Sequence, residues 1–251
     1  MHRFFVKPSL LASDEAVLPG PLAHQLLRVL RLRPGARIIL LNGEGEECEA
    51  EITALHAEQA RARILARRPA TGEPTRQVTL YQAVLKGPRF EWVLQKGTEL
   101  GVAAFVPILA SRCVAVPRDV DVKLVRWQAI VREAAEQAGR GRLPHVAAPL
   151  PFAAACASAK EKRAFLAWEG EKTTSLRRAL AELKDPQGST WALFIGPEGG
   201  FSAEEVALAQ GYGIRPVGLG PRTLRAETAS LAALAALFFA LGEWDDHHRP
   251  K

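Results

Sequence analysis

Residues 191–200 read WALFIGPEGG, an apolar run that ends in a loop of glycine and proline. A run of five apolar residues bounded by Gly and Pro predicts a buried strand rather than a helix. Directly after the loop, Ser202 and Glu205 have the spacing of a capping box, which begins a helix. We expect that helix to end near Gly211 or Gly213. This stretch therefore predicts a strand, a glycine loop and a helix in succession.

A second strand and a second glycine loop follow at once. Residues 214–219 predict a strand, and residues 220–228 (GPRTLRAET) form the loop after it. Residues 227–242 are rich in Ala, Leu and Phe, which predicts a long and mostly buried helix. Glycine loops at the ends of neighbouring strands line a crevice with backbone, and ligands of open α/β sheets bind in such crevices.

The charge of the first loop restricts the ligand. Residues 196–200 contain Glu198 and no Lys or Arg, and neither GxGxxG nor GxxxxGK[ST] is present in the chain. Phosphate binding favours bare amides and cations. The loop therefore indicates a neutral or cationic ligand. The alternative is that these glycines only turn the chain.

The rest of the C-terminal part alternates strands and helices. This alternation predicts an α/β fold with a parallel sheet covered on both faces. The expected strands are residues 78–85, 104–110 and 164–168, and the expected helices are residues 90–100, 119–138 and 173–183, the last capped by Thr173 or Thr174.

The N-terminal part has a different pattern. Residues 22–32 predict a short basic amphipathic helix, and three short alternating strands follow it, at residues 36–41, 48–55 and 59–65. Short strands at this spacing suggest a small β-barrel. We therefore expect a barrel domain over residues 1–68, a linker rich in Pro and Gly over 69–77, and the α/β domain over 78–251.

Basic charge points to a polyanionic partner. The chain has a formal net charge of +6 and a pI of about 9.5, and residues 86–142 hold ten Lys and Arg against six Asp and Glu. Cations of this kind position RNA through its phosphates. The alternative is that they solvate a helix face or pair with helix dipoles. The candidate RNA-binding residues are Arg3, His24, Arg28, Arg31, Lys86, Arg89, Arg132, Gln137 and Arg140.

Other site types have little support in the sequence. Cys48, Cys113 and Cys156 are far apart, so we expect buried small side chains rather than metal ligands or disulfides, and no metal site. No apolar run approaches the ~18 residues that a membrane span needs. The first residues do not form a signal-peptide pattern, so we expect a cytoplasmic protein without a membrane partner.

Two motifs together resemble a known family. GPEGGFS at residues 196–202, followed by LGPRTLRAETA at 219–229, resembles the RsmE family of SPOUT-class methyltransferases. The resemblance extends over nearly the whole chain and includes residues 1–5, 96–102 and 133–144. It implies S-adenosylmethionine (SAM)-dependent methylation of N3 of one uridine in 16S rRNA of the small ribosomal subunit. It also implies a PUA-like N-terminal domain, a trefoil-knotted SPOUT domain and a homodimer.

The resemblance also implies site residues. The cofactor would lie against Leu166, Ala167, Gly196, Pro197, Glu198, Gly199, Gly200, Leu219, Gly220, Leu224, Arg225, Thr228 and Ala229. Uracil N3–H is acidic only above neutral pH, so the site must stabilise the anion that forms. Arg225, a permanent cation with a planar fork, is our catalytic candidate for this. For its catalytic partner Glu227, orienting Arg225 or contacting the cofactor ranks above acting as the base, and an exposed ion pair is the alternative.

Three competing functions remain open from the sequence. The chain could be a SPOUT methyltransferase that acts on tRNA or 23S rRNA, or a non-catalytic RNA-binding protein of ribosome assembly. Intact glycine loops with Arg225 and Glu227 disfavour the second. The third, a nucleotide-dependent dehydrogenase, is disfavoured because GxGxxG is missing.

Overall fold

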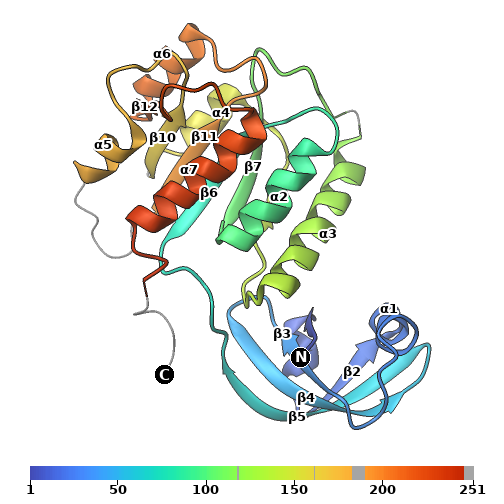
Figure 1. Ribbon diagram of the computed structural model, residues 1–251. Helices are drawn as coiled ribbons and strands as arrows, with labels where there is room; N and C mark the ends of the chain where they lie inside the picture. Colours follow the sequence, from blue (N-terminus) through green and yellow to red (C-terminus); the bar gives the residue numbers. More distant parts are fainter. Residues whose placement is uncertain (118, 161, 183–189, 246–251) are drawn as a thin grey trace. The chain divides into compact units, whose positions relative to one another are not determined.

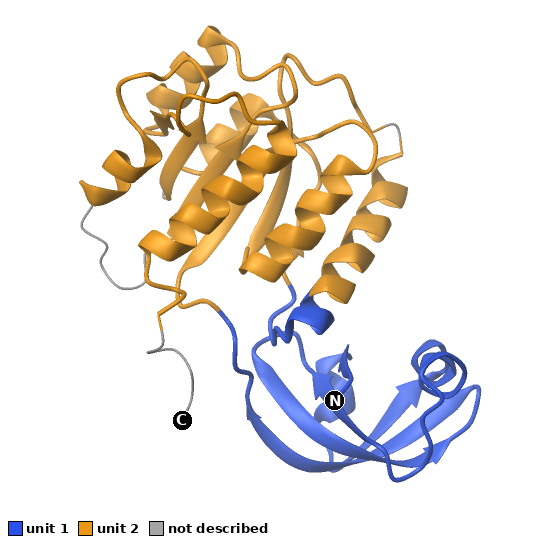
Figure 2. Ribbon diagram, viewed as in Figure 1, with its two compact units in different colours: residues 1–73, 135–143, 249–251 blue, residues 74–134, 144–248 orange. Residues whose placement is uncertain are grey.

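The computed structural model describes residues 1–117, 119–160, 162–182 and 190–245. The described residues divide into two compact units, shown in Figure 2. Residues 1–73 and 135–143 form the first unit, and residues 74–134 and 144–245 form the second. Within the expected linker, the last strand of the first unit ends at Pro69 and the first strand of the second begins at Gln77.

Five strands of the first unit form one curled sheet. In spatial order they are β1 (Arg3–Phe5), β3 (Arg37–Leu41), β4 (Glu46–Leu55), β5 (Gln59–Pro69) and β2 (Glu15–Pro19). β1 runs parallel to β3, and the other neighbours are antiparallel. The sheet is an open half-barrel (Figure 1), which confirms the expected PUA-like β-domain in an incompletely closed form. Its buried core comes from alternate strand positions, as period-two patterning requires.

The basic helix of this unit is shorter than the sequence predicts. A 3₁₀ turn (Pro8–Leu11) precedes it, α1 spans Gly20–His24, and a π-helical turn, η2, continues it over Gln25–Val29. The amide of Leu30 bonds to the Gln25 carbonyl, five residues back. Arg31 then has a φ of 53°, a left-handed conformation that ends the helix before the expected residue 32.

A buried carboxylate stabilises the half-barrel. Glu47 of β4 is 1% exposed, and its two oxygens accept from Arg3 Nη1 and Arg68 Nε, both at 2.6 Å. Burial opposes ionisation of this carboxyl, but the two arginines outweigh it and hold its pKa below the ordinary value. Arg3, a candidate RNA contact, is therefore engaged within the unit.

The second unit is built on a parallel sheet. Its spatial order is β12 (Arg215–Val217), β10 (Arg163–Ala167), β11 (Thr190–Ile195), β6 (Gln77–Ala83), β7 (Ala104–Leu109) and β8 (His145–Val146), and β9 (Leu150–Pro151) also pairs with β7. All of these pairs are parallel. From β6 the chain first adds β7 and β8 on one side of the sheet, and it later adds β10, β11 and β12 on the other side. The direction in which strands are added therefore reverses beside β6. Ligands of such sheets bind at the carboxyl ends of the strands near that reversal.

Helices cover both faces of this sheet (Figure 1). α2 (Arg89–Leu100), α3 (Val120–Ala138) and α7 (Ala226–Ala240) lie on one face, and α4 (Phe152–Ser158) and α6 (Ala203–Gly211) lie on the other. Ala192 and Phe194 of β11 pack in the core cluster with α4 and α6, and the intervening side chains point to the opposite face. The predicted α/β architecture is confirmed. No described helix is long and apolar enough to span a membrane.

Of two helix caps predicted from the sequence, the structure confirms one and contradicts the other. At α6, the predicted capping box is present: Glu205 N–H donates to Ser202 Oγ at 3.2 Å, and Ser202 N–H donates to Glu205 Oε2 at 2.9 Å. The expected cap of α5 (Leu176–Ala181) at Thr173 or Thr174 is wrong, because Ser175 caps this helix. The carboxylate of Glu171 instead accepts from the amides of both threonines and from the Thr173 hydroxyl.

Candidate functional site

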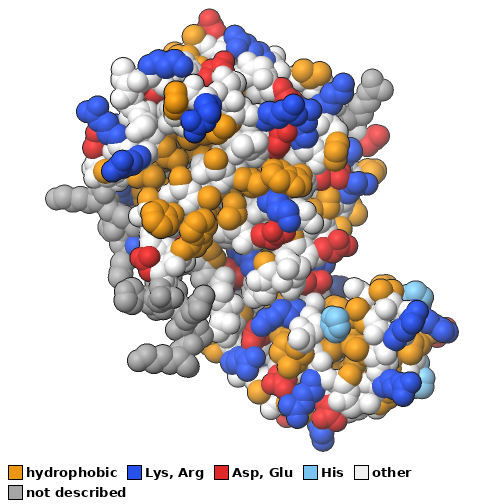
Figure 3. All heavy atoms as spheres, viewed as in Figure 1, with side chains coloured by type: hydrophobic (Ala, Val, Ile, Leu, Met, Phe, Trp, Pro, Cys, Tyr) orange, Lys and Arg blue, Asp and Glu red, His pale blue; other side chains and the backbone are white. Residues whose placement is uncertain are grey.

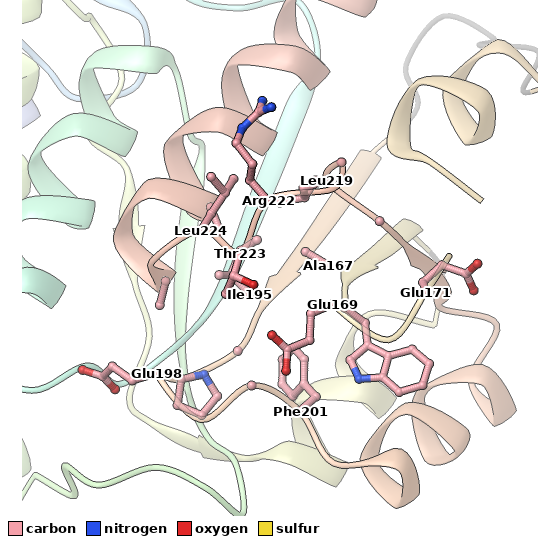
Figure 4. Close-up of a pocket in the computed structure, with 18 of the residues that line it drawn as sticks. Ala167, Glu169, Glu171, Ile195, Glu198, Phe201, Leu219, Arg222, Thr223 and Leu224 are labelled. Atoms are coloured by element: carbon pink, nitrogen blue, oxygen red, sulfur yellow. The ribbon is translucent and has the colours of Figure 1, made fainter. Parts of the chain in front are cut away.

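A cavity opens at the carboxyl ends of β10, β11 and β12 (Figure 4). Three loops that follow these strands wall it, together with the first turn of α7. The lining residues are Ala167, Trp168, Glu169, Glu171, Lys172, Ile195, Gly196, Pro197, Glu198, Gly200, Phe201, Gly218, Leu219, Gly220, Pro221, Arg222, Thr223, Leu224, Ala226 and Ala229. This is the position at which an open α/β sheet binds its ligand.

Two glycines allow the loops to approach closely. Gly200 has a φ of 67°, and its amide closes a tight turn on the Pro197 carbonyl at 2.9 Å. A Cβ atom on Gly218 would stand 2.7 Å from the Glu171 carbonyl oxygen, so only glycine fits there. The Gly218 amide donates to the Thr174 carbonyl at 2.8 Å. Residues 171–174 are thereby fixed against the end of β12.

Three carboxylates line the cavity, those of Glu169, Glu171 and Glu198, and two of them accept hydrogen bonds from other residues of the protein. The hydroxyl and amide of Thr173, with the Thr174 amide, lower the pKa of Glu171. Glu198 accepts from the Lys86 amide at 3.1 Å and from Arg89 at 3.3 Å. Among the described residues, none forms an ion pair or hydrogen bond with the carboxylate of Glu169. Glu169 is therefore the acid of this wall that is available to a cationic ligand.

Most of the predicted cofactor residues line this cavity. Those that do are Ala167, Gly196, Pro197, Glu198, Gly200, Leu219, Gly220, Leu224 and Ala229, whereas Leu166, Gly199, Arg225 and Thr228 are not part of the lining. Leu166 is fully buried in the core. The wall from Trp168 to Lys172 was missed, because this loop carries no glycine motif. The only signal in the sequence was that this loop follows a predicted strand, the position at which such sheets bind ligands.

The two catalytic candidates lie at the start of α7. Arg225 is exposed at the N-cap position, between Leu224 and Ala226 of the cavity wall. Glu227 faces Arg89, since its Oε1 lies 3.7 Å from Nε of Arg89. Its Oε2 is buried, and no donor among the described residues reaches it.

The candidate RNA contacts of the first unit differ in availability. His24, Arg28 and Arg31 are exposed around α1 and η2. Gln137, in the last turn of α3, is also exposed. Arg140 is only 3% exposed, and its Nη2 donates to Glu73 Oε2 at 2.9 Å. The expected phosphate contact of Arg140 is not supported by this placement, because the guanidinium is buried in an internal ion pair.

In the second unit, the structure separates the other basic candidates. Lys86 and Arg132 are exposed. Arg89 is directed at Glu198 and Glu227. The RNA contacts of Lys86 and Arg132 therefore remain predictions, whereas Arg89 is engaged by two carboxylates of the protein.

The cysteines and the acids form no further site in the described part of the chain. Cys48 and Cys156 are buried and Cys113 is partly buried, and all three are free thiols. Burial raises the pKa of Cys156 to about 11. Among the described residues, no group of His, Cys, Asp and Glu could hold a metal ion, and the absence of a metal remains a prediction.

The curled β-unit and the parallel-sheet unit with its backbone-lined cavity agree with the two-domain RNA methyltransferase that the sequence resemblance implies. Family profiles support this class: one described as RNA methyltransferase domain matches residues 71–238, and one described as RNA methyltransferase PUA domain matches residues 18–65.

Individual relatives narrow the class to one family. The chain is 37% identical to the ribosomal RNA small subunit methyltransferase E of Synechocystis sp., covering 94% of this chain and 77% of that protein. It is 31% identical to the protein of that name in Bacillus subtilis, covering 95% and 96%. A crystal structure of the Neisseria gonorrhoeae enzyme bound to SAM matches with a TM-score of 0.86 and 32% identity, covering 95% and 97%. The chain belongs to the ribosomal RNA small subunit methyltransferase E family.

Proposed function

We propose that this protein transfers a methyl group from SAM to N3 of a uridine in 16S rRNA of the small ribosomal subunit. The observation that carries the proposal is the cavity at the ends of β10, β11 and β12, in a chain whose fold matches a SAM-bound relative over nearly its whole length. A ribosomal substrate implies a cytoplasmic enzyme.

The residues of the cavity fit this cofactor. SAM supplies an activated methyl group on a cationic sulfonium. Glu169 offers a carboxylate that no described residue pairs with, and the Gly196–Gly200 loop contains no cation that would repel the ligand. Glu169 also reaches the glycine loop, since a Cβ on Gly200 would stand 3.8 Å from its Oε1. We assign Glu169 to the positive charge of the ligand and the loop backbone to its polar groups.

Arg225 would act on the uracil. Its guanidinium is exposed beside the cavity wall, and among the described residues it forms no ion pair. It can therefore donate to a uracil oxygen as negative charge develops there on loss of the N3 proton. Glu227 is tied to Arg89, so the structure favours a positioning role over that of a base.

The apolar surface of the second unit supports the homodimer that the resemblance implies. Trp92 of α2 is 43% exposed and Phe239 of α7 is 68% exposed. Figure 3 shows hydrophobic side chains gathered over this face. Exposed apolar patches mark interaction surfaces, and a second copy of this chain is our proposed occupant. The trefoil knot likewise remains a proposal.

A methylation assay tests the function. The protein and labelled SAM are incubated with each of three substrates in separate samples: small ribosomal subunits that lack the modification, naked 16S rRNA and bulk tRNA. Label at uridine N3 of the ribosomal samples is the expected result. Label in tRNA would move the protein to another substrate class, and SAM binding without label in any sample would contradict the assigned substrate. Failure to bind SAM would favour the non-catalytic assembly protein.

A further inference from the structure

The side chain of Arg89 joins two acids from distant parts of the chain. Arg89 begins α2; its Nη1 donates to Glu198 Oε1 at 3.3 Å, and its Nε lies 3.7 Å from Glu227 Oε1. Glu198 belongs to the glycine loop after β11, and Glu227 lies in the first turn of α7. Both segments wall the cavity. One guanidinium therefore connects the loop wall of the cavity to its helix wall.

A backbone amide close to Arg89 in the chain also binds Glu198. The amide of Lys86, in the loop before α2, donates to the oxygen that Arg89 also contacts. Figure 4 shows the Glu198 side chain directed away from the other labelled lining residues. Its carboxylate therefore anchors the glycine loop to residues 86–89 rather than facing the ligand.

Glu227 depends on Arg89 for its partner. The side chain is 15% exposed, Oε1 faces Arg89, and Oε2 is buried without a donor among the described residues. An ionised carboxylate that is largely buried is costly unless it is paired. Without Arg89, Glu227 would have to reach water, and the first turn of α7 would move with it. Ala226 and Ala229 of that turn line the cavity.

We propose that Arg89 is a positioning residue for the methyl-donor cavity, acting through Glu198 and Glu227, and not a phosphate contact. Arg89 itself is outside the set of described residues that line the cavity. The inference rests on the proposed function only in that the cavity binds SAM. It assigns Arg89 an effect on SAM affinity, whereas a phosphate contact would affect RNA affinity.

The test compares SAM binding and RNA binding in the full chain. SAM dissociation constants are measured by calorimetry for the wild type, Arg89→Ala, Glu198→Gln and the double variant, and binding of unmodified small subunits is measured without SAM. We expect each single variant to weaken SAM binding about tenfold, and the double variant to be no worse than the singles, because contacting residues couple. Arg89→Lys, which keeps the charge but reaches one acid, should recover part of the affinity. Subunit binding should stay within twofold of the wild type.

Arg126→Ala is the matched control. Arg126 of α3 forms a closer pair with Glu91 of α2, the helix that Arg89 begins, at 2.6 and 2.7 Å. Neither residue of this pair is among the described residues that line the methyl-donor cavity. If it weakens SAM binding as much as Arg89→Ala does, general destabilisation explains the effect and the inference falls. Unchanged SAM affinity in Arg89→Ala, with weaker and less salt-dependent subunit binding, would identify a phosphate contact and overturn the inference alone. Wild-type protein that binds no SAM would overturn the proposed function, and the inference with it.

Discussion

Arg225 lies between two residues of the cavity wall, and its side chain is exposed and forms no ion pair with any described residue. We expect Arg225→Ala to keep SAM affinity, because the side chain does not line the cavity. Turnover should fall about 100-fold or more, the usual effect of removing a donor that stabilises developing charge. Single-turnover methylation with calorimetric SAM binding measures both. The turnover of Arg225→Lys should lie between those of the wild type and Arg225→Ala. If the turnover of Arg225→Ala is within a few-fold of the wild type, Arg225 does not stabilise the developing charge.

Glu47 makes stability of the first unit depend on pH. Its pKa in the folded protein lies below the ordinary value of a glutamate, because hydrogen bonds from Arg3 and Arg68 outweigh burial. A depressed carboxyl pKa stabilises the fold above the unfolded pKa, and this stabilisation is lost as pH falls through the folded pKa. Glu47→Gln should therefore cost about 1–2 kcal/mol at pH 7. The difference in thermal unfolding midpoint between wild type and variant should shrink as the pH falls through the folded pKa of Glu47, and a difference independent of pH would contradict this account.

At the scale of elements, the contact between β12 and residues 171–174 determines the shape of one cavity wall. Gly218→Ala places a Cβ 2.7 Å from the Glu171 carbonyl oxygen, so the loop must move away from the strand. We expect a loss of about 1–3 kcal/mol in stability, typical of overpacking, together with weaker SAM binding. Gly211→Ala, where a new Cβ meets nothing within 4 Å, is the control and should leave both unchanged or slightly raise stability. Equal behaviour of the two variants in thermal unfolding and calorimetry would refute the contact.

Local signals in the sequence predicted elements better than contacts between them. The capping box joins Ser202 to Glu205, three positions further along the chain, and the structure forms it as expected. The start of α5 was misplaced because Glu171, outside the expected helix, competes for the amides of Thr173 and Thr174. α4 (Phe152–Ser158) escaped prediction because seven residues give too little periodicity.

In the candidate site, too, the motifs could be predicted from the sequence but the contacts between distant residues could not. Both glycine loops were visible as motifs, so most of the cavity wall could be predicted. The pairing of Arg89 with Glu227 joins residues more than a hundred positions apart. No spacing rule relates such residues, and the fold alone brings them into contact. Both residues were candidates for the site from their motifs, but their contact with each other could not be predicted from the sequence.

At the scale of the whole molecule, the exposed apolar face of α2 and α7 predicts self-association. The chain has a mass of 27.3 kDa, so sedimentation at micromolar concentration should show a species of twice that mass. Phe239→Glu places a charge at a side chain that is 68% exposed in the single chain, and desolvating that charge should yield monomers. Val29→Glu, at a 66% exposed residue of the other unit, is the control and should remain dimeric. A wild-type protein that sediments only as a monomer would show that this face serves another partner, such as the ribosomal subunit.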